Sequence, residues 1–183
     1  MSYDKEVNLD LSKLSDPALF IAAAETEDEL GCVLRFHLAV EKILVFYIMQ
    51  HLILGKESYI KVPREYGARL SYAVALGLPI PLAAVARQIN NMRNPLAHGD
   101  KAALDSGNVQ QLGRLVDALC TFDENHKPLN QRYLELPVAH PGQRITYGSG
   151  DLRLDFVLAA VAFLVTAKTW VVKDAAFLNL MAQ

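Results

Sequence analysis

Apolar residues recur at helical spacing along most of this chain, and the pattern predicts a mainly α-helical protein. Positions three or four residues apart lie on one face of a helix, so such a stripe marks a face that packs on its neighbours. Short connections favour antiparallel neighbours. We therefore expect an antiparallel bundle of about five helices. The pattern places them at residues 26–54, 64–76, 81–98, 109–122 and 152–180.

The ends of these helices are predicted from capping residues. Thr26 and Glu29 have the spacing of a capping box, which predicts that the first long helix begins at Thr26. Gly55 is expected to close that helix after Leu54. Residues 1–24 are expected to form a lead-in, with one or two helical turns starting at Pro17. The rest, residues 25–183, is expected to form a single domain.

The segment 126–153 lacks the helical pattern of the rest of the chain, because prolines and glycines interrupt it. Two short runs, 133–136 and 144–147, alternate as strands do and are expected to pair as a small β-hairpin inserted before the last helix. Its arginines have two readings, as solvated loop residues or as contacts to RNA. They are Arg132, Arg144 and Arg153.

Two stretches are apolar on nearly every side, 43–49 and 156–165. A helix that is apolar all round is buried all round. A small bundle hardly encloses the first of these stretches completely, so a subunit interface is a natural cover for it. This favours a homodimer.

Charge, cysteine spacing and the absence of targeting patterns limit the expected cellular location and binding partners of the protein. The formal net charge of −2 argues against a general nucleic-acid coat, so any contact with RNA has to be a local patch. Cys32 and Cys120 lack metal-ligand spacing, which predicts buried thiols in a reducing cytosol. The N-terminus has no signal-peptide pattern, and the uncharged run 156–167 is too short to span a bilayer. We expect a soluble cytoplasmic protein without metal or cofactor.

The richest chemistry lies in the third of the long helices. Its apolar seam is expected to face the core, because four residues fall within roughly 60° on an ideal helix. They are Val85, Ile89, Met92 and Leu96. The opposite side carries Arg87, Asn91, Asn94 and His98, with Arg93 on the flank. Pro95 is expected to kink or restart the helix and so to bring Arg93, Asn94 and His98 together.

Two polar residues of the first long helix are further candidates. His37 and Glu41 lie one turn apart and share a face. One reading is a satisfied polar pair at the edge of the bundle. The other is that Glu41 holds Arg93 through a charge-assisted hydrogen bond.

The stretch Arg93-Asn94-Pro95-Leu96-Ala97-His98 resembles the signature of HEPN domains, which has an arginine, a polar residue, three further residues and a histidine. The segments 66–78 and 36–44 are similar to helices of one branch of that superfamily, which includes proteins similar to the mannitol operon repressor. The resemblance covers roughly residues 28–125 and not the segment that follows. It implies a helical bundle, and for many members a metal-independent ribonuclease.

The resemblance implies roles for individual residues. Arg93 is expected to bind phosphate, His98 to act as acid or base, and Asn94 to orient them. Independently of the resemblance, we expect Arg87 and Asn91, on the same side of the helix as Asn94 and His98, to contact the substrate. Two such motifs are expected to meet in the cleft of a homodimer, in a toxin or stress-defence protein that has an antitoxin or regulatory partner. The alternatives are a non-catalytic regulator of the same fold and a purely structural dimerisation module, in which the same residues cap helix ends.

Overall fold

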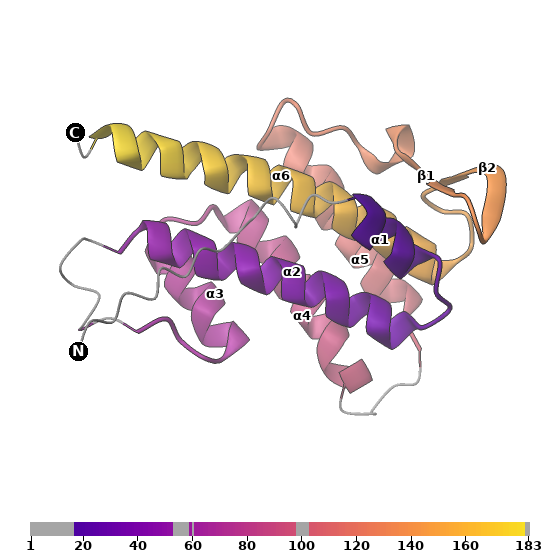
Figure 1. Cartoon of the computed structure of the whole chain (residues 1–183), viewed down its shortest axis with the longest axis horizontal. Coiled ribbons are helices and arrows are strands. Elements are labelled where there is room, and N and C mark those ends of the chain that lie inside the picture. Colours follow the sequence, from indigo (N-terminus) through magenta and orange to yellow (C-terminus); the bar gives the residue numbers. More distant parts are fainter. Residues whose placement is uncertain (1–16, 53–58, 60, 98–102, 182–183) are drawn as a thin grey trace.

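A computed structural model describes residues 17–52, 59, 61–97 and 103–181 of the chain. This part of the chain confirms a mainly α-helical bundle, with a small antiparallel hairpin between the last two α-helices (Figure 1). The α-helices are α1 (Pro17–Ala24), α2 (Glu29–Gln50), α3 (Tyr66–Ala75), α4 (Ile80–Ala97), α5 (Ser106–Asp117) and α6 (Leu152–Met181). Two 3₁₀-helices, η2 (Ala118–Thr121) and η3 (Leu129–Gln131), and two strands, β1 (Tyr133–Leu136) and β2 (His140–Thr146), complete it.

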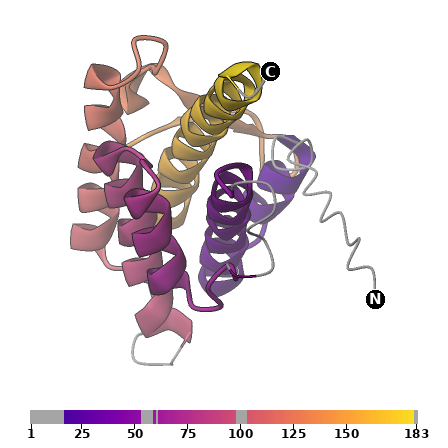
Figure 2. The ribbon, with the colours of Figure 1, turned by 90° about the vertical axis from the view of Figure 1, so that its left-hand side faces the viewer.

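The helices α2 and α6 lie side by side through the middle of the molecule. Seen end-on, α3, α4 and α5 form one side of the bundle, and α1 packs on α2 and α6 from the other side (Figure 2). This arrangement places α4 in contact with α2, α3, α5 and α6. The polar residues of α4 therefore lie among several helices rather than on an isolated one.

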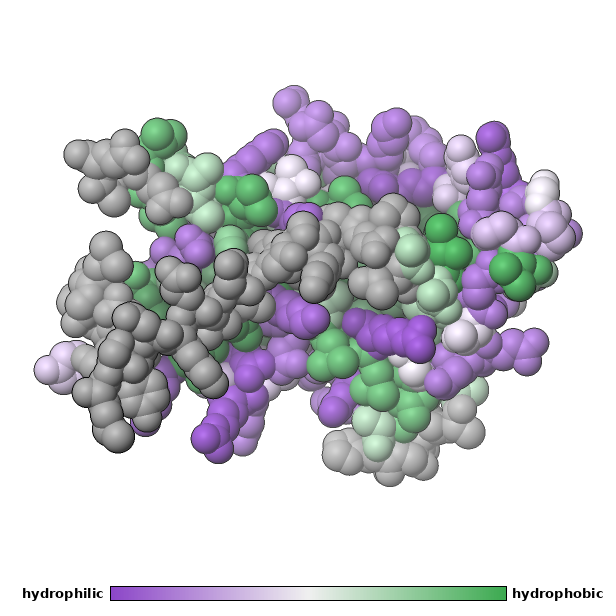
Figure 3. Space-filling model, in the orientation of Figure 1, coloured by the Kyte–Doolittle hydropathy of each residue, from purple (hydrophilic) through white to green (hydrophobic). Residues whose placement is uncertain are grey.

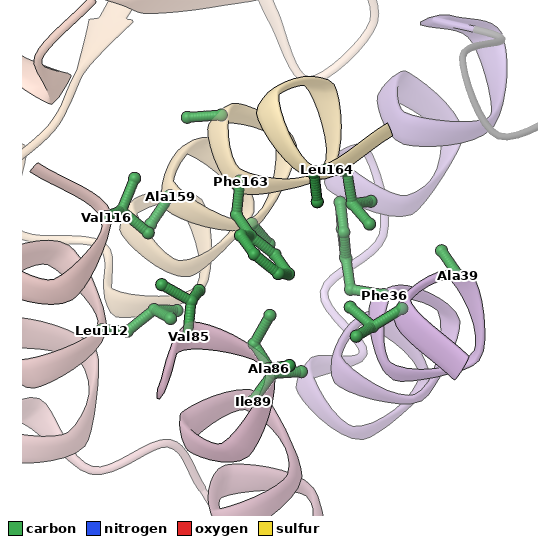
Figure 4. Packing of buried hydrophobic residues seen from close by; sticks show 14 of the residues in the cluster. Phe36, Ala39, Val85, Ala86, Ile89, Leu112, Val116, Ala159, Phe163 and Leu164 are labelled. Atoms are coloured by element: carbon green, nitrogen blue, oxygen red, sulfur yellow. The ribbon is translucent and has the colours of Figure 1, made fainter. Parts of the chain in front are cut away.

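The core forms where α2, α4, α5 and α6 meet. Phe163 of α6 points towards Ile89 of α4, while Leu112 of α5 and Phe36 of α2 close the sides (Figure 4). All four side chains are at most 2% exposed. Each such burial stabilises the fold by about 1.5–3 kcal/mol. The prediction that the run 156–165 is buried holds except at Val161, which is half-buried, and Val165, which is 51% exposed.

The first long helix begins later than the capping-box pattern predicted. Asp28 is its N-cap, and the Asp28 carboxylate accepts a hydrogen bond of 2.9 Å from the Gly31 backbone amide. Thr26 instead donates its hydroxyl to the Ala23 carbonyl at the end of α1, at 3.1 Å. The Thr26 prediction is therefore wrong, because the preceding helix uses that side chain.

The same helix also ends earlier than predicted. Its last residue is Gln50, with His51 as C-cap, rather than Leu54. Leu54 and Gly55 lie outside the described residues. In its apolar second half, Val45, Phe46 and Met49 are half-buried and the other four residues are buried.

The connection from α3 to α4 fixes the start of the motif helix. Gly77 adopts a positive φ of 107°, and the next residue, Leu78, donates its amide to the Ala73 carbonyl at 2.9 Å. This is a Schellman C-cap, for which glycine is preferred because it lacks a Cβ. The helix α4 then runs unbroken through Pro95 to Ala97 and does not restart there. Asn94 is helical, contrary to the prediction that Pro95 pushes it out of the α region.

The predicted hairpin is present and pairs Leu134 with Ile145 and Glu135 with Arg144. Its second strand covers His140–Thr146 rather than the predicted 144–147. It is fastened to α5 by Tyr147, whose hydroxyl donates to the Val109 carbonyl at 3.2 Å. Gly113 permits this contact, because a Cβ there would overlap the tyrosine. Of the three hairpin-region arginines, Arg144 is exposed, Arg132 is half-buried and Arg153 is buried.

By length and composition, Leu152–Leu178 of α6 is apolar enough to cross a membrane, although Lys168 interrupts its uncharged run. Within its most apolar window, 67% of the residues are buried inside the bundle. The core helix of a globular domain has the same features, so this is weak evidence for a membrane span.

Candidate functional site

The polar end of α4 carries two of the three motif residues that the sequence singled out. Arg93 and Asn94 are both half-buried, and an Arg93 Nη atom donates to the Asn94 side-chain oxygen at 3.2 Å. Arg93 Nε is buried and has no hydrogen-bond partner among the described residues. A buried N–H group without a partner costs free energy. This atom is therefore a donor available to an acceptor that the described residues do not supply.

The core face of α4 holds these residues in position. Val85, Ile89, Met92 and Leu96 are all buried, which confirms the predicted seam. Arg87 and Asn91 are exposed, on the predicted opposite face. Their expected contacts with RNA remain predictions. His98 lies outside the described residues, and Ala97 is the last residue of α4.

His37 of α2 reaches the same part of α4. Its Nε2 lies 3.1 Å from the side-chain oxygen of Asn90, one helical turn before Arg93 and Asn94. Its ring packs on the ring of Tyr66, with centroids 4.4 Å apart. The Tyr66 hydroxyl in turn donates to the Ala86 carbonyl of α4 at 2.8 Å. Side chains from α2, α3 and α4 therefore meet in one polar cluster.

The electrostatics of this cluster favour a neutral His37. Burial lowers the pKa of His37 below its ordinary value of 6.5, and the positive charge of Arg93 lowers it further. The hydrogen bond to Asn90 and the Glu41 carboxylate act in the opposite direction but do not overcome burial. With Asn90 as acceptor, Nε2 carries the proton, and a neutral ring leaves Nδ1 as an acceptor.

Glu41 does not hold Arg93. Its carboxylate forms a short ion pair with Arg69 of α3. His37 and Glu41 likewise do not pair with each other, because each has its partner on a neighbouring helix. Both side chains are satisfied, as the first hypothesis expected, although by residues of neighbouring helices, and the second hypothesis is wrong. Arg69 is further fastened by a bond from its Nε to the Pro63 carbonyl at 2.5 Å.

Sequence reasoning missed three members of the cluster, Tyr66, Arg69 and Asn90. Asn90 precedes Arg93 by one turn, so its helical position was a usable signal. Tyr66 and Arg69 are contributed by α3, and their meeting with α2 depends on how the helices pack. No periodicity within one segment reports such a contact.

Two other histidines, His126 and His51, contact side chains of α6 rather than the α4 site. His126, which lies between η2 and η3, is only 4% exposed, and its Nδ1 lies 2.7 Å from the Thr166 hydroxyl. His51 lies 3.2 Å from the Asp174 carboxylate.

Cys32 is buried, and burial raises the pKa of its thiol to about 12. Cys120, predicted to be buried, is half-buried. Among the described residues, no group of three or more histidine, cysteine, aspartate or glutamate side chains is placed to hold a metal ion.

Comparisons with models of protein families, with curated proteins and with solved structures found no match to this chain. The function of this chain is therefore inferred from its own residues and from the motif that they form.

Proposed function

We propose that this protein is a metal-independent endoribonuclease of the HEPN type with a toxin or stress-defence role. Its site would lie at the polar end of α4, in the cleft of a homodimer in the cytoplasm. The observation that supports this most directly is Arg93, half-buried, bonded to Asn94 and with a buried Nε that none of the described residues satisfies. An arginine placed in this way is suited to a phosphate oxygen.

The chemistry assigns a task to each residue. The ribose 2′-oxygen attacks phosphorus and loses its proton to a base, while the bond from phosphorus to the 5′-oxygen breaks and an acid protonates that oxygen. The products are a 2′,3′-cyclic phosphate and a 5′-hydroxyl end. Arg93 would stabilise the added negative charge, Asn94 would orient Arg93, and His98 would be the acid or the base. The second titratable group would come from His98 of the second copy.

The cluster around His37 would position this end of α4 rather than touch RNA. His37 is only 6% exposed and is bonded to Asn90. Arg87 and Asn91 lie on the exposed face of the same helix and are available to the RNA backbone.

The same cluster also supports a second candidate, a non-catalytic regulator of this fold. His37 pairs with Asn90 and Glu41 pairs with Arg69, so the described polar groups largely satisfy each other, as they do in a structural layer. In that case Arg93 would bind an acidic group of a protein or a nucleotide.

The deciding experiment measures RNA cleavage in excess EDTA by the wild type and by His98→Ala and Arg93→Ala. Matched controls are His140→Ala, on β2, and Arg64→Ala, which is exposed. If the protein is a ribonuclease, the wild type and the two controls cleave RNA and leave cyclic phosphate ends. The cleavage rate falls by about 100-fold or more in both site variants. The ribonuclease proposal would be contradicted if RNA stayed intact with the dimeric wild type at micromolar concentration. Equal cleavage rates of His98→Ala and His140→Ala would contradict it as well.

The regulator makes a different prediction. RNA stays intact, and a stable protein partner or a nucleotide is retained by the wild type and by Arg64→Ala but not by Arg93→Ala. Light scattering tests the dimer separately. A monomer at micromolar concentration would remove the composite site.

A further inference from the structure

The positive charge of Arg93 is not balanced by the groups around it. None of the ion pairs within the described part of the chain involves Arg93, and its guanidinium bonds to the uncharged side chain of Asn94. The Glu41 carboxylate of the same polar cluster is already held by Arg69. Two guanidinium groups therefore share one carboxylate, and the cluster has an excess of one positive charge while His37 is neutral.

His37 is placed to respond to that charge. Its imidazole is bonded to Asn90, and Asn90 lies one turn before Arg93 on neighbouring positions of α4. Burial lowers the pKa of His37, and the positive charge of Arg93 lowers it further. An effect of this kind is mutual, so a group that neutralises Arg93 makes His37 easier to protonate.

The surroundings of the imidazole favour a strong response. The His37 side chain is 6% exposed and packs on the ring of Tyr66, with centroids 4.4 Å apart. On the surface, hydrophobic residues lie among hydrophilic ones where α2 passes in front of the C-terminal end of α4, in the lower middle of Figure 3. Charges in partly apolar surroundings are screened less than charges in water. A change of charge at Arg93 is therefore felt at His37.

The other groups around the imidazole leave this response to Arg93. On α3, burial raises the pKa of Tyr66, so its hydroxyl stays neutral. Glu41 of α2 and Arg69 of α3 form an ion pair, so their charges offset each other. Of the charged groups around His37 that the structure describes, Arg93 is the one without a counter-charge.

We propose that His37 is a positioning residue of the α4 site that couples the uptake of a proton to the binding of an anion by Arg93. The coupling rests on the proposed function, in which Arg93 holds a phosphate group. The anion cancels the charge that opposes protonation of the imidazole, so binding and protonation favour each other. The site therefore binds a phosphate group more tightly as the pH falls. His37 acts through Arg93 and does not touch the ligand, because it is buried and bonded to Asn90.

Sulfate is a suitable probe, because it does not titrate near neutral pH and reports on Arg93 without catalysis. The full chain is titrated with sodium sulfate, with sodium chloride holding the ionic strength constant. NMR of the ring carbons of labelled histidine follows each imidazole from pH 7.5 to 5, and His37→Gln identifies the signal of His37. Sulfate is expected to raise the pKa of His37, and its affinity is expected to rise by about threefold or more as the pH falls across this range.

Variants with matched controls localise the coupling. Arg93→Met is expected to abolish the effect of sulfate on His37, whereas Arg64→Met, at an exposed arginine, keeps it. His37→Gln retains a neutral donor to Asn90 and is expected to bind sulfate with an affinity that no longer rises as the pH falls, whereas His140→Gln keeps the rise. A residue that only supports the fold would change the affinity equally at every pH. Circular dichroism checks that each variant is folded.

Four results would overturn the proposal. Sulfate could fail to bind, it could leave the titration of His37 unchanged, or its effect could persist in Arg93→Met. A rise in affinity that persists in His37→Gln would assign the coupling to another group, such as His98. The ribonuclease is decided separately by RNA cleavage. An inactive wild type that shows the coupling keeps the anion site as part of a regulator, and an active wild type without the coupling loses only the role of His37.

Discussion

The two sides of α4 differ in kind. Towards α5 and α6 the helix presents a dry apolar seam that includes Val85 and Ile89, both fully buried. Towards α2 and α3 it presents Asn90, which contacts His37, and Arg93, whose buried Nε has no partner within the described part of the chain. The dry side stabilises the bundle by removing apolar area from water. The polar side contributes little net stability, because each hydrogen bond replaces one to water. The difference teaches that stability and chemistry are carried by neighbouring faces of one helix.

The largest expected effect comes from the dry side. Ile89→Ala removes a side chain with no exposure and leaves a cavity beside Phe163, so the free energy of unfolding should fall by about 2–5 kcal/mol. Ile80→Ala, at the other end of the same helix and 66% exposed, should change it by less than about 0.5 kcal/mol. Urea denaturation measures both. Equal losses in the two variants would mean that the seam is not the stabilising face.

A smaller and opposite effect is expected on the polar side. Arg93→Met keeps the length of the side chain but removes the Nε that has no partner. The free energy of unfolding should stay the same or rise by about 1 kcal/mol, because an unsatisfied buried donor is lost. RNA cleavage, if Arg93 binds phosphate, should be abolished in the same variant. A clear destabilisation in urea would show instead that Arg93 is a structural residue.

The sequence predicted the dry side better than the polar side, and the reason is physical. Periodicity is a property of one segment, so the helical seam from Val85 to Leu96 and the strand-like run 133–136 could be predicted directly. Helix capping depends on which hydrogen-bond partners lie nearby. Thr26 does not cap α2, because its hydroxyl donates to the Ala23 carbonyl instead. The pairing of Glu41 with Arg69 depends on how α2 and α3 pack, which no local pattern encodes.

The smallest expected effect is the pH dependence of stability that His37 introduces. Burial lowers its pKa in the folded protein, whereas the unfolded chain titrates near 6.5. Above that pH the His37 imidazole is neutral in both the folded and the unfolded state, and its contribution to the free energy of unfolding is fully present. As the pH falls through about 6.5 towards the lower pKa of the folded protein, the unfolded chain takes up the proton first, so the free energy of unfolding decreases.

Glutamine keeps a neutral donor at this position without titrating, so His37→Gln should lose less stability than the wild type between about pH 6.5 and 5.5. His126, whose pKa burial also lowers, should behave in the same way, and the two replacements should add because the residues occupy different parts of the bundle. His140→Gln on the hairpin is the control, with the slope of the wild type expected. If urea midpoints across this range fall as steeply in His37→Gln as in the control, the imidazole is not held neutral against Asn90, and the polar side of α4 is more hydrated than its contacts indicate.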